Sequence, residues 1–186
     1  MSDIPLFRNH MILDACCVIN LAASDHMKSI LYTFPAQKTI SRYVREKEVR
    51  YMCGNDGEHI SIDLQPLLDN TLLHLVDLES EEEYNTVINL ASLSNGKMGN
   101  GEAISASIAI HRNWTFATDD RDAILLLQQH LPQLHIVTTP DLLKYWTSVA
   151  HPSDNVVREI LEKIQRKARY KPYVDHHLEQ WWQMYQ

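Results

Sequence analysis

The hydrophobic pattern in the middle of the chain predicts a buried helix followed directly by a buried strand. After a break at Asn100 and Gly101, residues 103–111 carry alanine and isoleucine on most faces, which is typical of a helix inside a core. Residues 114–118 (WTFAT) are rich in the β-branched and aromatic types that favour a strand. The acidic sequence DDRD (residues 119–122) follows at once. The pattern therefore predicts a strand that ends at a group of carboxylates.

Similar units, each a short apolar run followed by a helical pattern, occupy the rest of the chain. The predicted strands are 11–13, 38–40, 60–62, 72–78 and 134–137. The predicted helices are a pair over 17–31 broken near Ser24, then 42–52, 63–70, one starting after Ser80, 123–131 and one starting at Thr139. Residues 53–58 (CGNDGE) are typical of a surface loop or hairpin. Strands that alternate with helices predict an α/β fold, a parallel-sheet α/β/α sandwich.

Several helix starts carry recognisable caps. Ser41 precedes the helix predicted over residues 42–52, and Thr139 with Pro140 at the first position begins the helix that follows the last predicted strand. Ser80 and Glu83 have the spacing of a capping box. We therefore interpret the acidic run 79–83 as a helix start and not as a ligand cluster.

A boundary at His151-Pro152-Ser153 divides the prediction into a domain over residues 1–150 and a C-terminal segment over 151–186. The segment starts with an apolar stripe at helical spacing, which predicts an amphipathic helix that needs a partner surface. Its members are Val156, Val157, Ile160, Leu161 and Ile164. An aromatic tail follows, which we expect to pack on its own domain or on another subunit, with stacking on nucleotides as the alternative. Its members are Tyr170, Tyr173, His176, His177, Trp181, Trp182 and Tyr185.

Composition limits the classes of function. The chain has 186 residues, 45% hydrophobic and 22% charged, which is enough for one globular domain with a core and an appendage. A net charge of −7 argues against non-specific binding of duplex nucleic acid, which depends on many phosphate contacts. Three cysteines, two of them adjacent, do not form a disulfide framework. Because no apolar run approaches the ~20 residues of a membrane span and the first ten residues lack a secretory pattern, we expect a cytoplasmic protein without a membrane segment.

The acidic residues suggest a metal site. Asp14 closes the apolar strand over residues 11–13, as the group 119–122 closes the later strand, and Glu102 opens the helix between them. The carboxyl ends of parallel strands meet at one edge of a sheet, where open α/β folds bind ligands. Clustered carboxylates repel one another unless some are protonated or a hard cation lies between them. The cation expected with oxygen ligands is Mg²⁺ or Mn²⁺.

Three motifs together resemble the PIN-domain family of metal-dependent nucleases, many of which are ribonuclease toxins of bacterial toxin–antitoxin pairs. They are DACCVINL (residues 14–21), Gly101-Glu102-Ala103 and Thr118-Asp119-Asp120-Arg121-Asp122. The resemblance covers roughly residues 11–146. It implies four acids, which are Asp14, Glu48, Glu102 and Asp120, with Asp119 as a further metal ligand.

The second of these acids has two candidates in the sequence. Glu46 and Glu48 are two residues apart, so only one of them can face the cluster. We choose Glu48 because its surroundings are similar to the family's segment. Around the acids we expect supporting or substrate contacts from Asn20, Ser41, Glu46, Thr118 and Asp122, with Asn20 alternatively a helix-surface amide and Asp122 alternatively a helix cap. Arg42 and Arg45 are either phosphate contacts or part of a solvated helix face.

The resemblance implies hydrolysis of phosphodiester bonds, with single-stranded or structured RNA as the expected substrate. It also implies an antitoxin as a possible partner and a homodimer as a possible assembly. The alternative is a catalytically silent domain of the same fold that binds partners through its C-terminal segment. A phosphatase with an aspartate nucleophile is disfavoured, because position 16 is cysteine where an Asp-x-Asp motif needs an acid.

Overall fold

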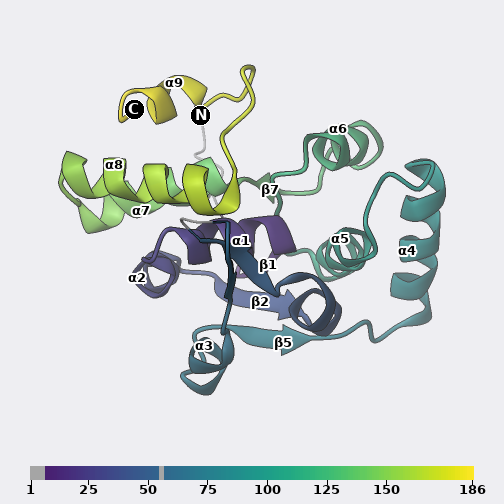
Figure 1. Cartoon of the computed structure of the whole chain (residues 1–186). Coiled ribbons are helices and arrows are strands. Elements are labelled where there is room, and N and C mark those ends of the chain that lie inside the picture. Colours follow the sequence, from purple (N-terminus) through teal and green to yellow (C-terminus); the bar gives the residue numbers. More distant parts are fainter. Residues whose placement is uncertain (1–6, 55–56) are drawn as a thin grey trace.

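A computed structural model describes residues 7–54 and 57–186 (Figure 1). The strands are β1 (His10–Leu13), β2 (Gln37–Ser41), β3 (Tyr51–Cys53), β4 (His59–Ser61), β5 (His74–Val76), β6 (Thr115–Ala117) and β7 (Ile136–Val137). The helices are α1 (Ala15–Ala23), α2 (Met27–Thr33), η1 (Val44–Glu48), α3 (Gln65–Asp69), α4 (Glu81–Leu93), α5 (Asn100–Arg112), α6 (Arg121–His130), α7 (Thr139–Ala150), α8 (Asp154–Lys163), η2 (Ile164–Ala168) and α9 (Glu179–Gln183). Within these ranges, no helix has both the length and the apolar character needed to cross a bilayer.

Five strands form one parallel sheet in the order β5-β2-β1-β6-β7, which confirms the predicted α/β class. The chain builds the sheet outward from β1 to β2 and β5, and then returns to β6 and β7 on the other side. The strand order therefore reverses between β1 and β6. At such a reversal the loops leave the sheet in opposite directions and open a crevice at the carboxyl ends of the strands.

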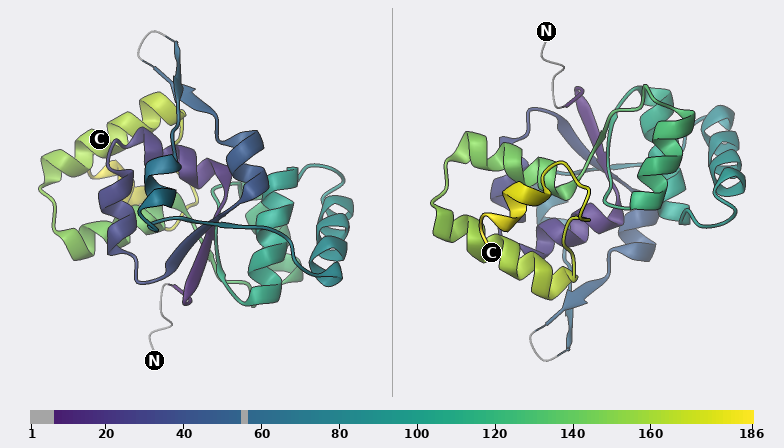
Figure 2. Two further views of the ribbon diagram at one scale, coloured as in Figure 1. Left: turned by 90° about the horizontal axis from the view of Figure 1, so that it is seen from below. Right: turned by 90° about the horizontal axis from the view of Figure 1, so that it is seen from above.

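Helices cover both faces of the sheet, as a sandwich requires (Figures 1 and 2). Because side chains alternate along a strand, Met11 and Leu13 join one core cluster while Ile12 joins the other. The first cluster contains side chains of α1, α2, α7 and α8. The second contains side chains of α5 and α6, with α4 packed on the outer side of α5. Alanine and serine make much of the inner surface of α5, which lets this helix lie close to the sheet.

The helix predicted over residues 42–52 is wrong in its second half. It widens into the π-helical turn η1, closed by a hydrogen bond from the Val49 amide to the Val44 carbonyl at 3.0 Å, and ends there. The chain then enters β3, which pairs antiparallel with β4. Residues 51–53 form a strand because they pair with β4. The helical periodicity of the sequence contains no information about this pairing. The predicted hairpin is present, although residues 55 and 56 of its expected loop lie outside the described residues.

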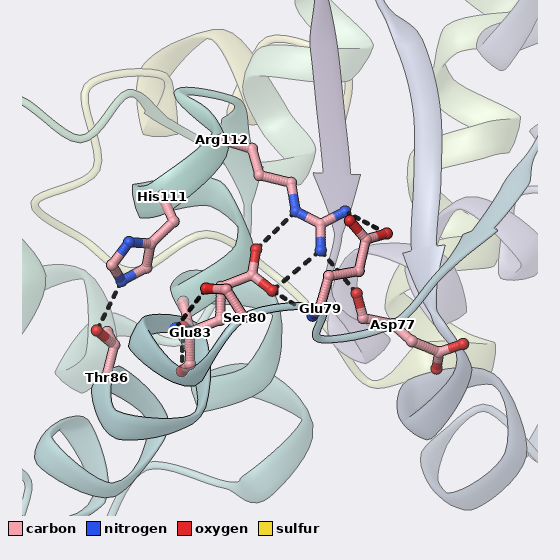
Figure 3. Close-up of polar contacts among 8 residues, drawn as sticks. Asp77, Glu79, Ser80, Glu83, Thr86, His111 and Arg112 are labelled. Carbon is pink, nitrogen blue, oxygen red and sulfur yellow. Dashed lines mark hydrogen bonds and ion pairs between the residues drawn. The ribbon is translucent and has the colours of Figure 1, made fainter.

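The acidic run before α4 is a helix start, as predicted. The Ser80 hydroxyl accepts the Glu83 amide at 3.2 Å. The Glu83 carboxylate accepts the Glu79 amide at 2.6 Å, one residue before the Ser80 amide that a capping box uses. Glu83 also pairs with Arg112 at the end of α5, with Nε 2.6 Å from Oε1 (Figure 3). This ion pair, with the Glu83 side chain buried and the Arg112 side chain partly buried, links α4 to α5.

Two helix caps lie one or two residues from their predicted positions. Thr138, and not Thr139, caps α7 and forms a complete capping box with Asp141. Asp120, and not Asp122, caps α6 by accepting the Ala123 amide at 2.9 Å. Both shifts place the cap nearer the carboxyl edge of the sheet.

The C-terminal segment packs on the first core cluster. Val157, Ile160, Leu161 and Ile164 of the predicted stripe are buried there against the same cluster as β1. Trp181 and Trp182 in the tail are also buried in it, so these two rings pack on their own chain. Viewed from above, α9 lies across α7 and α8 (Figure 2).

Candidate metal centre

The candidate site lies where the strand order reverses. The register pairs Leu13 of β1 with Ala117 of β6, and the Asp14 amide donates to the Ala117 carbonyl at 2.9 Å. The next residues on the two strands, Asp14 and Thr118, therefore start from neighbouring positions at the carboxyl edge. This edge is the ligand-binding position of an open parallel sheet.

Asp14 is a buried carboxylate that lacks half of its expected partners. Its side chain is 6% exposed and makes no capping bond to α1, although the residue occupies the N-cap position. The Cys16 thiol donates to Oδ2 at 3.0 Å, but Oδ1 has no hydrogen-bond partner among the described residues. Burial raises the pKa of Asp14. A buried, unpartnered carboxylate oxygen is costly, and a cation is one group that meets this need.

Glu102 in the first turn of α5 is a second buried acid, with 7% of its surface exposed. The Thr118 hydroxyl donates to its Oε1 at 3.2 Å. Burial, together with the negative charges of Asp14 and Asp120, raises the pKa of Glu102 to about 8. The charges of Asp14 and Asp120 thus disfavour ionisation of Glu102, an effect that a bound cation would offset.

Glu48 reaches the same region from the end of η1. Its Oε1 accepts the Gly101 amide at 3.1 Å, and a β-carbon at position 101 would lie 2.1 Å from its Oε2. Burial raises the pKa of Glu48, and the charge of Asp14 contributes. Glu46 instead is exposed and lies 3.9 Å from Arg42. The structure therefore brings Glu48, and not Glu46, to the other acids.

Asp120 completes the group from the loop after β6. Its backbone amide donates to the Thr118 hydroxyl at 3.3 Å, and its Oδ1 caps α6. The side chain is exposed, so it stands at the open side of the cluster. Its charge acts on Glu102, as described above.

Asp119, for which the family resemblance implies a ligand role, has both carboxylate oxygens engaged in hydrogen bonds. Its Oδ1 accepts the Thr139 amide and the Tyr170 hydroxyl, each at 2.8 Å. Its Oδ2 accepts the Asn20 amide group at 2.8 Å and the Thr139 hydroxyl at 2.5 Å. Together with the Cys17 thiol described below, five donors from α1, α7 and the C-terminal segment hold this carboxylate, and we leave Asp119 out of the proposed ligand set. Asn20 is neither a surface amide nor a group facing substrate, since it is buried and holds Asp119.

Two cysteines next to the acids donate hydrogen bonds. Cys16, Cys17 and Asp119 could offer ligand atoms within 4.8 Å of one another. However, the Cys16 thiol donates to Asp14 and the Cys17 thiol donates to Asp119 at 3.4 Å. Burial raises the pKa of Cys17, which keeps that thiol protonated. The arrangement suits thiols that position carboxylates, because metal binding requires thiolates.

The remaining candidates stand around the cluster. Ser41 is buried and accepts the Val44 amide at 3.2 Å, so it acts as the predicted helix cap. Asp122 is exposed in the first turn of α6. Arg42 pairs with Asp77 at 3.1 Å, and Arg45 donates to Gln65 at 2.9 Å; both are surface contacts.

Sequence reasoning missed two residues of the site. For Cys16 the sequence predicts only a small buried side chain. The signal that could have found it is its position two residues after Asp14. Tyr170 reaches Asp119 across 51 residues, and no local pattern reports such a contact.

Comparison of the chain with protein-family models, with curated proteins and with solved structures found no match in any of the three. The resemblance to PIN domains therefore stays a prediction based on the three motifs. Function has to be inferred from the acids themselves.

Proposed function

We propose that this chain is a nuclease that depends on Mg²⁺ or Mn²⁺ and hydrolyses phosphodiester bonds in RNA. The observation that carries the proposal is the convergence of Asp14, Glu48, Glu102 and Asp120 at the reversal point of the sheet. In particular, Asp14 Oδ1 is buried and lacks a partner among residues 7–54 and 57–186. An all-oxygen donor set of this kind suits a hard divalent cation.

Asp14, Glu102 and Asp120 would hold the cation, and Glu48 would complete the site. A bound divalent cation would neutralise negative charge on the phosphate and lower the pKa of a bound water molecule. The chain's own groups orient these acids: Cys16 holds Asp14, Thr118 holds Glu102, and the Gly101 amide holds Glu48. The expected products of such hydrolysis are a 5′-phosphate and a 3′-hydroxyl.

The proposal is tested by digesting labelled single-stranded RNA and DNA with purified protein in Mn²⁺, in Mg²⁺ and in EDTA. We expect metal-dependent cleavage of RNA that falls at least about 100-fold in Glu102→Gln and in Asp120→Asn, the scale seen when a positioned charged group is removed from an active site. Asp154→Asn, an exposed acid on α8, is the matched control and should cleave like the wild type. Equal cleavage by all four proteins would show that a contaminant or another site is responsible.

Toxin biology remains a further part of the proposal. A small antitoxin would cover the acidic edge and offer a basic group to it, and a homodimer is the expected assembly. Co-expression with the product of a neighbouring reading frame tests the first, and light scattering tests the second.

The alternative function, a silent interaction domain acting through the C-terminal segment, has less support. Trp181 and Trp182 are buried in the chain's own core and are not available to a partner. Such a domain would also have no need of a buried carboxylate oxygen without a donor.

A further inference from the structure

A groove opens beside the acids, between the end of α4 with its following loop and helix α6. Its volume is about 290 Å³. Asp120 lines it, and Asp120 also belongs to the acidic cluster. The groove therefore adjoins the candidate metal centre at Asp120.

The lining of the groove combines apolar walls with a polar edge. Leu93 of α4 and Leu125 of α6 contribute apolar surface, and both are unusually exposed for leucine, at 48% and 53%. Met98, which is buried, also lines the groove. A pocket with apolar walls and a few polar groups is typical of a small-ligand site.

The polar edge supplies both signs of charge and both kinds of hydrogen-bonding group. Lys97 offers an ammonium group, and Gln129 offers an amide that can donate and accept. Asp122 offers a carboxylate that accepts only. The amino, ring N–H and carbonyl groups of a nucleobase need this combination, and Lys97 can meet an adjoining phosphate.

We infer that this groove receives one nucleobase of a single-stranded substrate, the base next to the phosphodiester at the acids. The inference rests on the proposed nuclease function and extends it to base selection. A duplex hides its bases in the stack, so a base can enter only from a single strand or a loop. The groove thereby makes the enzyme selective for unpaired RNA and gives it a base preference at one position.

The size of the groove favours a base over a protein segment. About 290 Å³ is just below the ~300–1,000 Å³ range of small-ligand pockets, which suits a ligand as small as one base. A docked helix or a second copy of the chain needs a longer apolar surface, on the order of 800 Å² on each partner. The charged edge formed by Lys97 and Asp122 also suits a polar planar ligand better than an apolar helix face.

The binding experiment is methyl NMR of methionine-labelled protein with Mg²⁺. The probes are the four nucleoside 5′-monophosphates, with ribose 5-phosphate as the control that lacks a base. We expect the Met98 methyl signal to shift with at least one nucleotide and not with ribose 5-phosphate, while Met27 on α2 stays unchanged. A Met98 shift that ribose 5-phosphate reproduces, or that follows protein concentration without nucleotide, would overturn the inference, the latter by indicating a contact between copies.

Variants then connect the groove to base selection. Gln129→Ala and Leu125→Gln should weaken nucleotide binding about two- to tenfold, the range for one lost hydrogen bond or contact. They should also flatten the base preference of RNA cleavage. The matched control is Gln128→Ala, since Gln128 is the exposed neighbour on the same helix and does not line the groove. Unchanged nucleotide affinity and base preference in both groove variants would refute the inference.

The two proposals fail in different ways. If the nuclease proposal is wrong, the wild type shows no metal-dependent cleavage at any base. If only the groove inference is wrong, the wild type cleaves RNA, and the groove variants cleave it at the same positions with the same rates.

Discussion

The carboxylate of Glu48 occupies the space that a side chain at Gly101 would need. The Gly101 amide donates to Glu48 Oε1 at 3.1 Å, and a β-carbon at position 101 would lie 2.1 Å from Oε2 and 2.4 Å from the carboxyl carbon. The absence of a side chain at Gly101 thus leaves room for the carboxylate of an acid that lies 53 residues away in the chain. The relationship joins η1 to the start of α5, and so joins two of the four acids.

Gly101→Ala should weaken metal binding while leaving the stability of the fold nearly unchanged. The clashing atoms are the far end of a flexible side chain, so Glu48 can move away, and alanine in a helix is favoured over glycine by roughly 0.5–1 kcal/mol. We expect a melting temperature within a few degrees of the wild type but a Mn²⁺ affinity reduced about tenfold. Calorimetric titration with Mn²⁺ measures the affinity.

The matched control is Gly99→Ala, because a β-carbon at Gly99 would have nothing within 4 Å of it. Its Mn²⁺ affinity should equal that of the wild type. An unchanged affinity in Gly101→Ala would remove Glu48 from the site.

The acids should make the metal-free protein less stable as the pH rises. The pKa of Glu102 is about 8 in the folded chain and 4.5 as its ordinary value, so between these values the folded state holds a proton that the unfolded state has lost. Stability that depends on this proton is complete below about pH 4.5 and is lost as the pH rises through about 8. Glu102→Gln should therefore raise the melting temperature at pH 8.5 in EDTA, by about 2–4 °C for each ~1 kcal/mol recovered.

Thermal melting from pH 5 to pH 9 checks this prediction. The gain from Glu102→Gln should be much smaller at pH 5, because the stability that the wild type loses accumulates as the pH rises from the ordinary value of 4.5 to about 8. A gain that is the same at both ends of the range would mean that Glu102 does not titrate as described.

Tyr170 should stabilise the fold without taking part in metal binding. Its hydroxyl donates to Asp119 Oδ1 at 2.8 Å and links the C-terminal segment to the loop after β6. A hydrogen bond to a charged group contributes roughly 1.5–3 kcal/mol, so Tyr170→Phe should lower the melting temperature by several degrees. The ring of Tyr170 packs edge-on against Trp182 and remains in phenylalanine, which limits the change to the hydroxyl.

Tyr173→Phe on the same segment serves as the control and should melt close to the wild type. If Tyr170→Phe melted like Tyr173→Phe, the contact with Asp119 would carry no stability. A lower Mn²⁺ affinity in Tyr170→Phe would instead show that Asp119 reaches the metal site.

The sequence predicts the sheet well because its strands are short apolar runs that end in polar residues. The runs around Ile12 and Phe116 show where strands lie, and Asp14 and Thr118 show where they stop. The small apolar residues of α5 likewise predict a buried helix. These signals are local, and the structure confirms the parallel sheet that they predict.

Contacts between distant segments could not be predicted in the same way. Helical spacing after Ser41 hid the turn into β3, which depends on pairing with β4. Likewise, Tyr84 and Ile88 have helical spacing on α4 but are exposed, because the buried face of this helix carries Glu83 and Leu90. The pair between Glu83 and Arg112 needs a partner 29 residues away, which no local pattern specifies.

The same contrast between local signals and contacts of distant segments applies to the candidate site. Motifs alone predict Asp14, Glu102 and Asp120 as site residues, and the surroundings of Glu48 favour it over Glu46. The hydrogen bonds of Asp119 could not be predicted from its motif, since their donors come from α1, α7 and the C-terminal segment.

The measurement that tests the central claim most directly is the melting temperature during a Mn²⁺ titration at pH 7.5. Wild type, Asp14→Asn and the surface control Asp154→Asn are compared. A ligand that binds only the folded state stabilises it by about 2.7 kcal/mol at 100 times its dissociation constant, a rise of several degrees for a chain of this size. We predict a saturable rise in wild type and Asp154→Asn that is lost in Asp14→Asn. No rise in the wild type, or an equal rise in Asp14→Asn, would contradict a metal centre at these acids.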